Sequence, residues 1–436
     1  MGRWERVTVQ PDFQGLTRRE RTGGTYLRYH PDPMPTGRSV VSPDVSELVT
    51  DASTAVATLG QRLRDRPVPL LYATLLRSES LASSWIEGLR ETPRNVMAAR
   101  LADVEGTPGT AQDVLRNIDA MASGIAALRS ATWTHEDIHA IHATLLPRES
   151  QGRYRTDQVD IGGRTPLTAS YVAPPHDEVP DLMADLLRYV ATTGDPPLVA
   201  ALLVHAQFET IHPYEDGNGR TGRALFHAVL ARAGLVDQGV LPLSLVLRDD
   251  VEAYVAALTA YRPGASGAGT AAEARHAYLR TMLDMVTDAA RIAGDMIDEV
   301  AAVHARWKPY VERLRTDSSV HRLLDLLVEQ PVVTPGLVQD RLGVSRVTAN
   351  TALTELARVG VVQRAGGRFK RQHVYQAGDV LALMDAYVPG PATVTLPPPP
   401  AVPMRRYGGE RCGHLLPRRQ VPCTLPLGHP GPHRAP

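Results

Sequence analysis

Helical periodicity dominates this chain of 436 residues. Between residues 43 and 316, apolar side chains recur at intervals of three and four residues, which is the spacing of one face of an α-helix. Residues 152–175 interrupt this pattern, because glycine and proline pairs there separate two short β-prone pieces around Val159–Ile161 and Tyr171–Val172. We therefore expect a mainly α fold with one β-hairpin inserted in it. The clearest helical stretches cover 178–192, 196–210, 219–233, 248–261 and 272–316.

Charge, hydropathy and cysteine usage exclude several classes of protein. The 47 basic and 47 acidic residues cancel, which argues against a uniformly basic nucleic-acid binder. No apolar run reaches the ~18 residues of a membrane-spanning helix, and the polar N-terminus lacks the apolar core of a signal peptide. The first 411 residues contain no cysteine, which excludes a disulfide-stapled fold. These exclusions lead us to expect a cytoplasmic protein, and we expect it to be bacterial. All but two of the basic residues are Arg, which we interpret as the codon bias of a GC-rich genome.

The zero net charge is a sum of unlike segments. Residues 331–378 contain seven basic residues against two acidic, and residues 401–436 contain six against one, so the remainder is acidic. Such asymmetry marks domains with different partners. We expect a poorly ordered N-terminal segment (1–40), an N-terminal helical region (41–130) and a helical core (131–316). A C-terminal helical module (317–380), a Pro-rich linker (381–403) and a basic Cys/His tail (404–436) follow.

The most informative stretch is His212–Arg223, with the sequence HPYEDGNGRTGR. A Gly-rich turn here opens into an amphipathic helix, and N–H groups at a helix N-terminus form an anion site. Gly217 and Gly219 let the backbone approach a phosphate without a Cβ in the way. Arg220 and Arg223 lie three residues apart on one helix face, where two guanidinium groups can hold polyphosphate oxygens.

The same stretch offers a base and a metal ligand. His212 carries an imidazole, which accepts a proton near neutral pH. Asp216 supplies the carboxylate oxygen that suits a magnesium ion touching phosphate. The alternative is an ordinary glycine turn before a helix, with both arginines on a solvated face.

The whole segment is similar to the Fic family motif, H-x-F-x-[DE]-G-N-G-R-x-x-R, with Tyr214 where Phe is usual. The ring is ordinarily a packing residue, so the exchange costs little if its hydroxyl finds a partner. The resemblance implies an all-helical core and the Mg²⁺-dependent transfer of AMP from ATP to a Ser, Thr or Tyr hydroxyl of a target protein. By match to the motif, His212 deprotonates the target and Asp216 holds Mg²⁺. Asn218, with the backbone of Gly217 and Gly219, binds the α- and β-phosphates. Arg220 and Arg223 clamp the β/γ end.

Residues 155–175 match the position of the family's flap, a hairpin that clamps the target by strand pairing. Val159, Ile161, Gly162 and Gly163 lie within it. An ordinary connecting hairpin is the alternative.

Upstream, Ser83–Gly88 resembles the family's inhibitory motif, [ST]-x-x-x-E-[GN]. Ser83 and Glu87 are four residues apart, so we expect both to face one way from a helix that stops at Gly88. The resemblance implies that Glu87 pairs with Arg223, displaces the γ-phosphate and so inhibits the chain in cis. A solvated helix face that ends at a glycine cap is the alternative.

Residues His135–His139 satisfy H-E-x-x-H, the zinc protease signature. They follow immediately on Thr134, an N-cap with Asp137 three residues later, which is typical of a capping box. We therefore interpret them as the start of a helix.

The order of elements predicted over 319–377, three helices followed by a hairpin, is that of a winged helix. Its third helix offers Arg346, Thr348, Asn350 and Thr351 to a DNA groove, and its wing offers Arg364, Arg368, Lys370 and Arg371 to phosphates. Winged helices also serve as protein-docking or dimerisation modules, so DNA and protein both stay open as partners.

Four side chains of the tail form a sensible tetrahedral zinc set, Cys412, Cys423, His429 and His433. A disordered basic tail or a redox-labile cysteine pair is the alternative. Other options left open are a homodimer, transfer of another phosphate-linked group, removal of AMP with water positioned by Glu87, and a nucleotide-sensing DNA-binding regulator.

Overall fold

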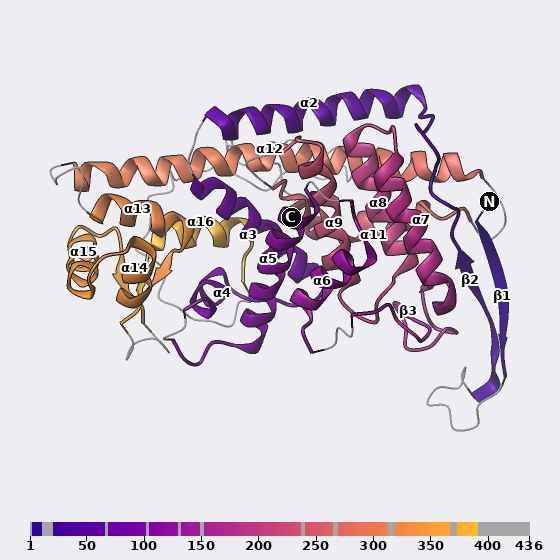
Figure 1. Ribbon diagram of the computed structural model, residues 1–436, viewed down its shortest axis with the longest axis horizontal. Helices are drawn as coiled ribbons and strands as arrows, with labels where there is room; N and C mark the ends of the chain where they lie inside the picture. The colour runs from indigo at the N-terminus through magenta and orange to yellow at the C-terminus, as the bar shows by residue number, and fades with distance from the viewer. Residues whose placement is uncertain are drawn as a thin grey trace, which may run out of the picture. The chain divides into compact units, whose positions relative to one another are not determined.

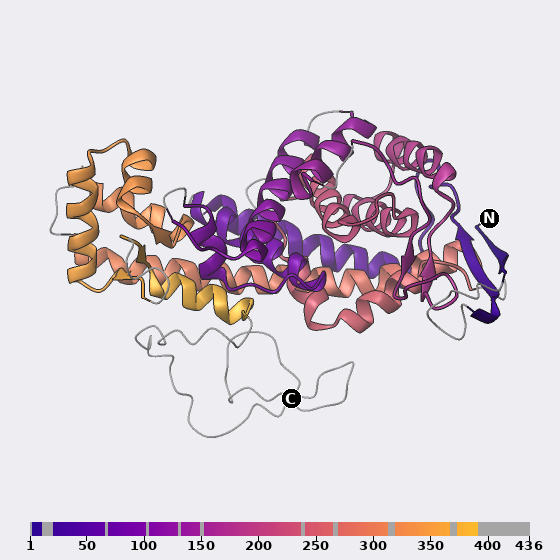
Figure 2. The same ribbon diagram turned by 90° about the horizontal axis from the view of Figure 1, so that it is seen from below.

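A computed structural model describes the chain over residues 2–10, 21–65, 69–101, 104–129, 132–148, 152–236, 240–264, 269–312, 319–366 and 373–390. The fold is mainly helical, as the periodicity predicts, and its strands are few and short (Figures 1 and 2). The described residues form two compact units, one from 1–57, 116–237 and 246–287, the other from 58–115, 238–245 and 288–436.

The first unit contains the segment that carries the Gly-rich motif. Its elements, in chain order, are β1 (Arg3–Val9), β2 (Gly24–His30), α6 (His135–Leu145), β3 (Asp160–Ile161), β4 (Tyr171–Val172), the short 3-10 helix η1 (His176–Glu178), α7 (Val179–Thr192), α8 (Pro197–Ile211), α9 (Asn218–Arg232) and α11 (Val251–Ala260). Residues of both units occur in α2 (Pro43–Asp65), α5 (Gly109–Leu128), α10 (Leu243–Asp249) and α12 (Ala271–Val311).

α8 is the central helix of the first unit. Its sequence is apolar on every side, and almost all of its side chains are buried. α9 packs along it (Figure 1). The approach is close at Gly222, where a Cβ would lie 3.1 Å from Cδ1 of Phe208 and 3.3 Å from Nδ1 of His205. Glycine at this position therefore lets α9 lie against α8.

The N-terminal segment differs from the prediction. The sequence predicts a poorly ordered segment over 1–40, but β1 and β2 pair antiparallel, from Arg3 opposite His30 to Val9 opposite Gly24. The physical reason is an aromatic contact: Tyr29 is 2% exposed, and the ring of the partly buried Trp4 lies 4.9 Å from its ring. Alternating aromatic and β-branched side chains, interleaved with arginines, stabilise strands that composition alone does not indicate.

The second unit combines helices from the middle of the chain with the C-terminal module. Its elements are α3 (Pro69–Ile86), α4 (Pro93–Ala99), α13 (Ser319–Glu329), β5 (Val332–Val333), α14 (Pro335–Leu342), α15 (Arg346–Arg358), β6 (Gln363–Arg364), β7 (Tyr375–Gln376) and α16 (Gly378–Tyr387). The three strands form an antiparallel sheet in the order β5-β7-β6. α13 and α16 both pack against α3.

Within the part of the chain that the structure describes, no helix combines the length and the apolar character needed to cross a membrane.

Candidate active site

α8 carries His212 at its C-terminal cap. The last hydrogen bond of the helix runs from the N–H of His212 to the carbonyl of Phe208, at 2.8 Å. His212 then adopts the left-handed conformation, with φ 50° and ψ 63°. Among the described residues no other non-glycine residue has a positive φ. The side chain of His212 is 17% exposed, so its imidazole lies at the edge of the core.

The Gly-rich turn fits tightly against α6. Gly217 has φ 78°, and a Cβ there would lie 2.9 Å from Cδ1 of Leu146. The amide of Asn218 closes the turn: its Oδ1 accepts from the N–H of Tyr214 at 2.9 Å, and its Nδ2 donates to the carbonyl of Tyr214 at 2.8 Å. The side chain that the motif assigns to phosphate binding is thus occupied in shaping the loop.

The N-terminus of α9 supplies backbone donors. The N–H of Thr221 already bonds the carbonyl of Gly217, at 3.0 Å, and begins the helical ladder. The N–H groups of Asn218, Gly219 and Arg220 lie ahead of that ladder, in the first turn of α9. N–H groups in this position and the helix dipole are the arrangement on which the sequence-based prediction of an anion site depends.

Both arginines of the motif are buried. Arg220 is 3% exposed and Arg223 is 2% exposed. Nη2 of Arg220 lies 3.6 Å from Oδ1 of Asp216, one helical turn away. A solvated face, the alternative left open by the sequence, is wrong. Desolvated guanidinium groups interact with phosphate more strongly than exposed ones do.

Asp216 fits the role of a magnesium ligand. Its side chain is 66% exposed, and its Oδ1 accepts the N–H of Gly217 at 2.5 Å. No group of three or more His, Cys, Asp or Glu side chains gathers as a metal site among the described residues. One carboxylate beside a phosphate site is nevertheless the usual protein contribution to Mg²⁺, since the nucleotide supplies further oxygens.

A second carboxylate lies near the imidazole. Oε2 of Glu209, one turn earlier on α8, is 3.9 Å from Nδ1 of His212. The side chain of Glu209 is 11% exposed, so this pair is poorly screened by solvent. The sequence motif did not single out Glu209, because its position becomes informative only once α8 is known to end at Ile211.

The three histidines of α6 contact tyrosines. Thr134 caps this helix in a capping box with Asp137, as the sequence predicts. Nδ1 of His135 shares a hydrogen bond with the hydroxyl of Tyr154, at 2.8 Å. The hydroxyl of Tyr214 lies 2.8 Å from Nδ1 of His139, and the ring of His142 stacks on the Tyr214 ring at 3.8 Å. His139 and His142 of α6 therefore support the Gly-rich loop through Tyr214.

The predicted hairpin is present. Asp160 pairs with Val172 and Ile161 with Tyr171. The connection requires glycine: Gly162 has φ 73°, and a Cβ at Gly163 would lie 2.5 Å from the N of Ala169. The remaining residue named for this hairpin, Val159, accepts the N–H of Ala173 at 3.2 Å.

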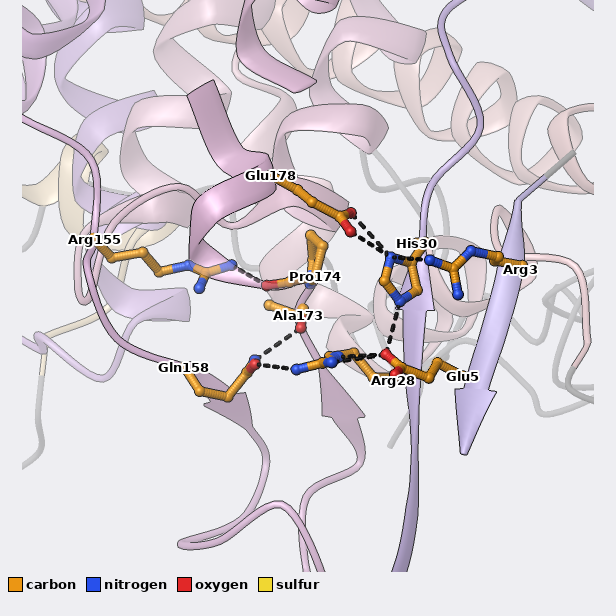
Figure 3. A network of polar contacts seen from close by, with 9 residues as sticks. All are labelled: Arg3, Glu5, Arg28, His30, Arg155, Gln158, Ala173, Pro174 and Glu178. Carbon is orange, nitrogen blue, oxygen red and sulfur yellow. Dashed lines mark hydrogen bonds and ion pairs between the residues drawn. The ribbon is translucent and has the colours of Figure 1, made fainter. Parts of the chain in front are cut away.

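The hairpin is held on one side by the N-terminal strands (Figure 3). Nε2 of Gln158 donates to the carbonyl of Ala173 at 2.8 Å, and Arg28 of β2 donates to Oε1 of Gln158 at 3.4 Å. Nearby, His30 lies between two carboxylates, with Nε2 3.0 Å from Glu5 and Nδ1 2.9 Å from Glu178. These contacts fix the first and last residues of the hairpin segment relative to β2.

On its other side the hairpin is attached through Arg155, a residue that the sequence did not single out. Its guanidinium is buried, and its Nη2 donates to the carbonyl of Pro174 at 2.6 Å (Figure 3). Nothing local in the sequence marks this arginine, because its partners near α8 are 56 and 57 residues away.

The two residues of the candidate inhibitory motif, Ser83 and Glu87, lie at the C-terminal end of α3. α3 ends at Ile86, and the bonds from Gly88 N–H to Trp85 and from Leu89 N–H to Ser84 close it as a Schellman motif, with Gly88 at φ 82°. Ser83 is fully buried, whereas Glu87 lies in the turn and is exposed. The predicted stop at Gly88 is confirmed.

The candidate zinc ligands Cys412, Cys423, His429 and His433 lie outside the described residues, as do Arg368, Lys370 and Arg371 of the predicted wing.

Comparison with known proteins agrees with the motif. Residues 132–230 match the Fic/DOC family, and residues 46–126 match the Fic/DOC family N-terminal region. The chain thus carries a Fic/DOC family domain preceded by the N-terminal region of the same family.

Two curated relatives and one solved structure illustrate the similarity. Protein adenylyltransferase fic-1 of Caenorhabditis briggsae is 33% identical over 132 residues, 29% of this chain and 25% of that protein. A probable protein adenylyltransferase of Aquifex aeolicus is 32% identical over 116 residues, 26% of this chain and 32% of that protein. The chain therefore spans a third or less of these relatives. A Fic family protein from Desulfovibrio desulfuricans G20 superposes with a TM-score of 0.50 and 26% identity, over 79% of this chain and 98% of that one.

Proposed function

We propose that this chain is a protein adenylyltransferase that transfers AMP from ATP to a Ser, Thr or Tyr hydroxyl of a target protein. The observation that carries the proposal is the loop from His212 to Arg223. It joins a histidine at the end of one buried helix to the N-terminus of the next, with a carboxylate and two arginines around that N-terminus. The matched relatives named as protein adenylyltransferases support the same reaction.

The reaction is an in-line displacement at the α-phosphorus. The target oxygen forms the new ester bond, while the bond from the α-phosphorus to the α–β bridging oxygen breaks and pyrophosphate leaves. His212 accepts the proton of the attacking hydroxyl at one ring nitrogen, and Glu209, 3.9 Å from Nδ1, favours the imidazolium that results.

The N-terminus of α9 holds the phosphates. Backbone N–H groups of Asn218, Gly219 and Arg220 and the helix dipole favour the charge on the α- and β-phosphates. Arg220 and Arg223 hold the β/γ end. Magnesium, when bound through Asp216, neutralises phosphate charge and orients the leaving group.

The hairpin and Glu87 complete the proposal. An edge strand that includes Val159 and Ile161 pairs with an extended target segment, and Gly162 and Gly163 keep the connection tight. Glu87, exposed in the turn after α3, pairs with Arg223 and displaces the γ-phosphate in the resting state. Ser83, four residues before Glu87 and buried, is the other residue of this inhibitory motif.

Incubation with α-labelled ATP and Mg²⁺ tests the reaction. We expect Glu87→Gly to label itself or an added target much faster than the wild-type chain, and His212→Ala in that background to lose the label. Intact-mass measurement identifies the added group, so another nucleotide or phosphate-linked group is recognised by its mass. Absence of label from Glu87→Gly with every nucleotide contradicts the proposal. If the protein instead removes AMP from a target that already carries it, its activity is the removal of AMP.

A second candidate function concerns the C-terminal module. We propose that α13, α14, α15 and the sheet β5-β7-β6 form a winged helix that binds DNA. The supporting observation is the outward face of α15. Arg346, Asn350, Thr351 and Thr354 are exposed, and Val347 is 76% exposed, whereas Ala349, Ala352, Leu353 and Leu356 are buried. Amide, hydroxyl, guanidinium and apolar groups on one helix face suit base edges in a major groove.

Binding of the full chain to a pool of random duplexes, followed by selection, tests this candidate. We expect Arg346→Ala and Asn350→Ala to weaken binding to the selected sequence at least fivefold, and Arg291→Ala, an exposed arginine of α12, to leave it unchanged. A response of DNA affinity to ATP in the His212→Ala variant would favour a nucleotide-sensing regulator. No selection above background, or equal affinity in all three variants, assigns the module to protein docking.

A further inference from the structure

The backbone of His212 needs an explanation. Non-glycine residues avoid a positive φ, and they keep one only where the surrounding structure holds it. α8 also ends here, so the carbonyls of Ile211, His212 and Pro213 accept no hydrogen bond from a following helical turn. Carbonyls at the edge of the core require donors from elsewhere.

Arg155 supplies those donors. Its Nε donates to the carbonyl of His212 at 2.8 Å, its Nη2 approaches the carbonyl of Ile211 at 3.4 Å, and its backbone N–H donates to the carbonyl of Pro213 at 2.9 Å. The side chain is 5% exposed. A cation at this point also complements the negative end of the α8 dipole.

The same guanidinium holds both ends of the hairpin segment. Nη1 donates to the carbonyl of Asp157 at 2.8 Å, just before β3, and Nη2 donates to the carbonyl of Pro174 at 2.6 Å, just after β4 (Figure 3). One side chain therefore connects the backbone of His212 with the hairpin that lies beside β2.

We propose that Arg155 is a positioning residue of the transfer reaction, which sets the His212 imidazole at a fixed place relative to a target hydroxyl paired with the hairpin. This inference rests on the proposed function. The Arg155 side chain contacts backbone carbonyls and touches no reacting atom. It acts through the backbone of His212 and through the hairpin ends, so nucleotide binding at the N-terminus of α9 does not depend on it.

Only arginine suits this position. The planar guanidinium directs its donors to four carbonyls at once, whereas a lysine ammonium offers three donors from a single point. Burial lowers the pKa of Arg155 to about 10, which still leaves the group charged at neutral pH.

The experiment compares Arg155→Lys and Arg155→Met in the Glu87→Gly chain, with Arg153→Met, an exposed arginine two residues earlier, as the matched control. Misplacement of a reacting group by about 1 Å costs roughly 100-fold in rate. We therefore expect the labelling rate at saturating ATP to fall about 100-fold in Arg155→Met and about 10-fold in Arg155→Lys. The ATP-induced rise in melting temperature should stay as in the parent, and Arg153→Met should match the parent in both measurements.

A labelling rate of Arg155→Met within threefold of the parent overturns the inference. An equal loss of the labelling rate and of the ATP-induced rise in melting temperature also overturns it, because that result marks a merely structural role. If Arg155→Met does not fold, Arg155→Lys decides by the same criteria. If the Glu87→Gly parent carries no label, the proposed function fails, and hydrogen exchange then tests Arg155 separately. We expect the His212 amide to exchange at least tenfold faster in Arg155→Lys and unchanged in Arg153→Met. Equal exchange in the two variants overturns the positioning role.

Discussion

Tyr214 stands where the family motif has Phe, and its surroundings account for the hydroxyl. The ring is 2% exposed and stacks on His142, while the hydroxyl lies 2.8 Å from Nδ1 of His139. Burial, and then the nearby His135, lower the pKa of His139. The His139 ring is therefore neutral at pH 7, and its Nδ1 accepts a hydrogen bond from the Tyr214 hydroxyl. The exchange of Phe for Tyr costs little only if the hydroxyl finds water or a partner, and His139 of α6 is such a partner.

Tyr214→Phe isolates the contribution of that hydroxyl. It restores the family's usual ring but leaves Nδ1 of the half-buried His139 without its donor, so we expect a loss of about 1 kcal/mol in the free energy of unfolding. Urea unfolding measures this loss, with Tyr310→Phe, an exposed tyrosine of α12, as the control that should show none. Because the ring position is kept, the labelling rate should stay within twofold. A large loss of labelling would assign the hydroxyl to the chemistry.

Features that depend on neighbouring residues were predictable from the sequence, and contacts between distant residues were not. The capping box at Thr134, the stop at Gly88 and the turn at Gly217 each depend on residues a few positions apart. Arg155 depends on carbonyls 56 and 57 residues away, and no spacing in the sequence encodes that distance.

The pairing of β1 with β2 is the feature of the fold that the sequence did not predict. Polar contacts of these two strands make their stability depend on pH. Glu5 accepts hydrogen bonds from Arg28 and lies against His30, and these contacts lower the pKa of Glu5 to about 2 from its ordinary value of 4.5. The folded state thus favours the ionised carboxylate. The stabilisation from Glu5 is complete above about pH 4.5 and is lost as the pH falls towards 2.

Glu5→Gln tests this dependence. At pH 7 we expect the amides of β1 and β2 to exchange faster in Glu5→Gln than in the wild type, after correction for intrinsic rates, because the ion pair with Arg28 is lost. The difference should shrink as the pH is lowered from 4.5 to 2, since the wild-type carboxylate then takes up its proton. Glu47→Gln, an exposed residue of α2, serves as control. Exchange that differs equally at pH 7 and pH 2.5 would contradict the assignment.

The second unit is built from segments that lie far apart in the sequence, and dividing the chain by its charge and proline content does not predict this grouping. Charge and proline content separate the C-terminal module from the N-terminal helical region, yet the structure groups the described residues of 58–115 with those of 288–390. Within this unit α13 and α16 pack on α3, the helix that precedes Glu87. Arg94 of α4 donates to the carbonyl of Gly366 at 3.2 Å. Segments more than 200 residues apart therefore share one core, which composition along the chain does not encode.

Gln330 is the side chain on which this shared core can be tested. It is 1% exposed, and its Nε2 donates to the carbonyl of Met97 in α4 at 2.8 Å and to that of Val332 in β5 at 2.7 Å. Gln330→Ala leaves both carbonyls buried without this donor, so we expect a loss of about 2 kcal/mol in the free energy of unfolding. Hydrogen exchange should accelerate to a similar extent in α4 and in α13, because the two segments open together. Asn350→Ala, whose exposed amide bonds only within α15, should leave both segments unchanged. Acceleration in α13 with full protection of α4 would instead show that the C-terminal module folds independently of α3 and α4.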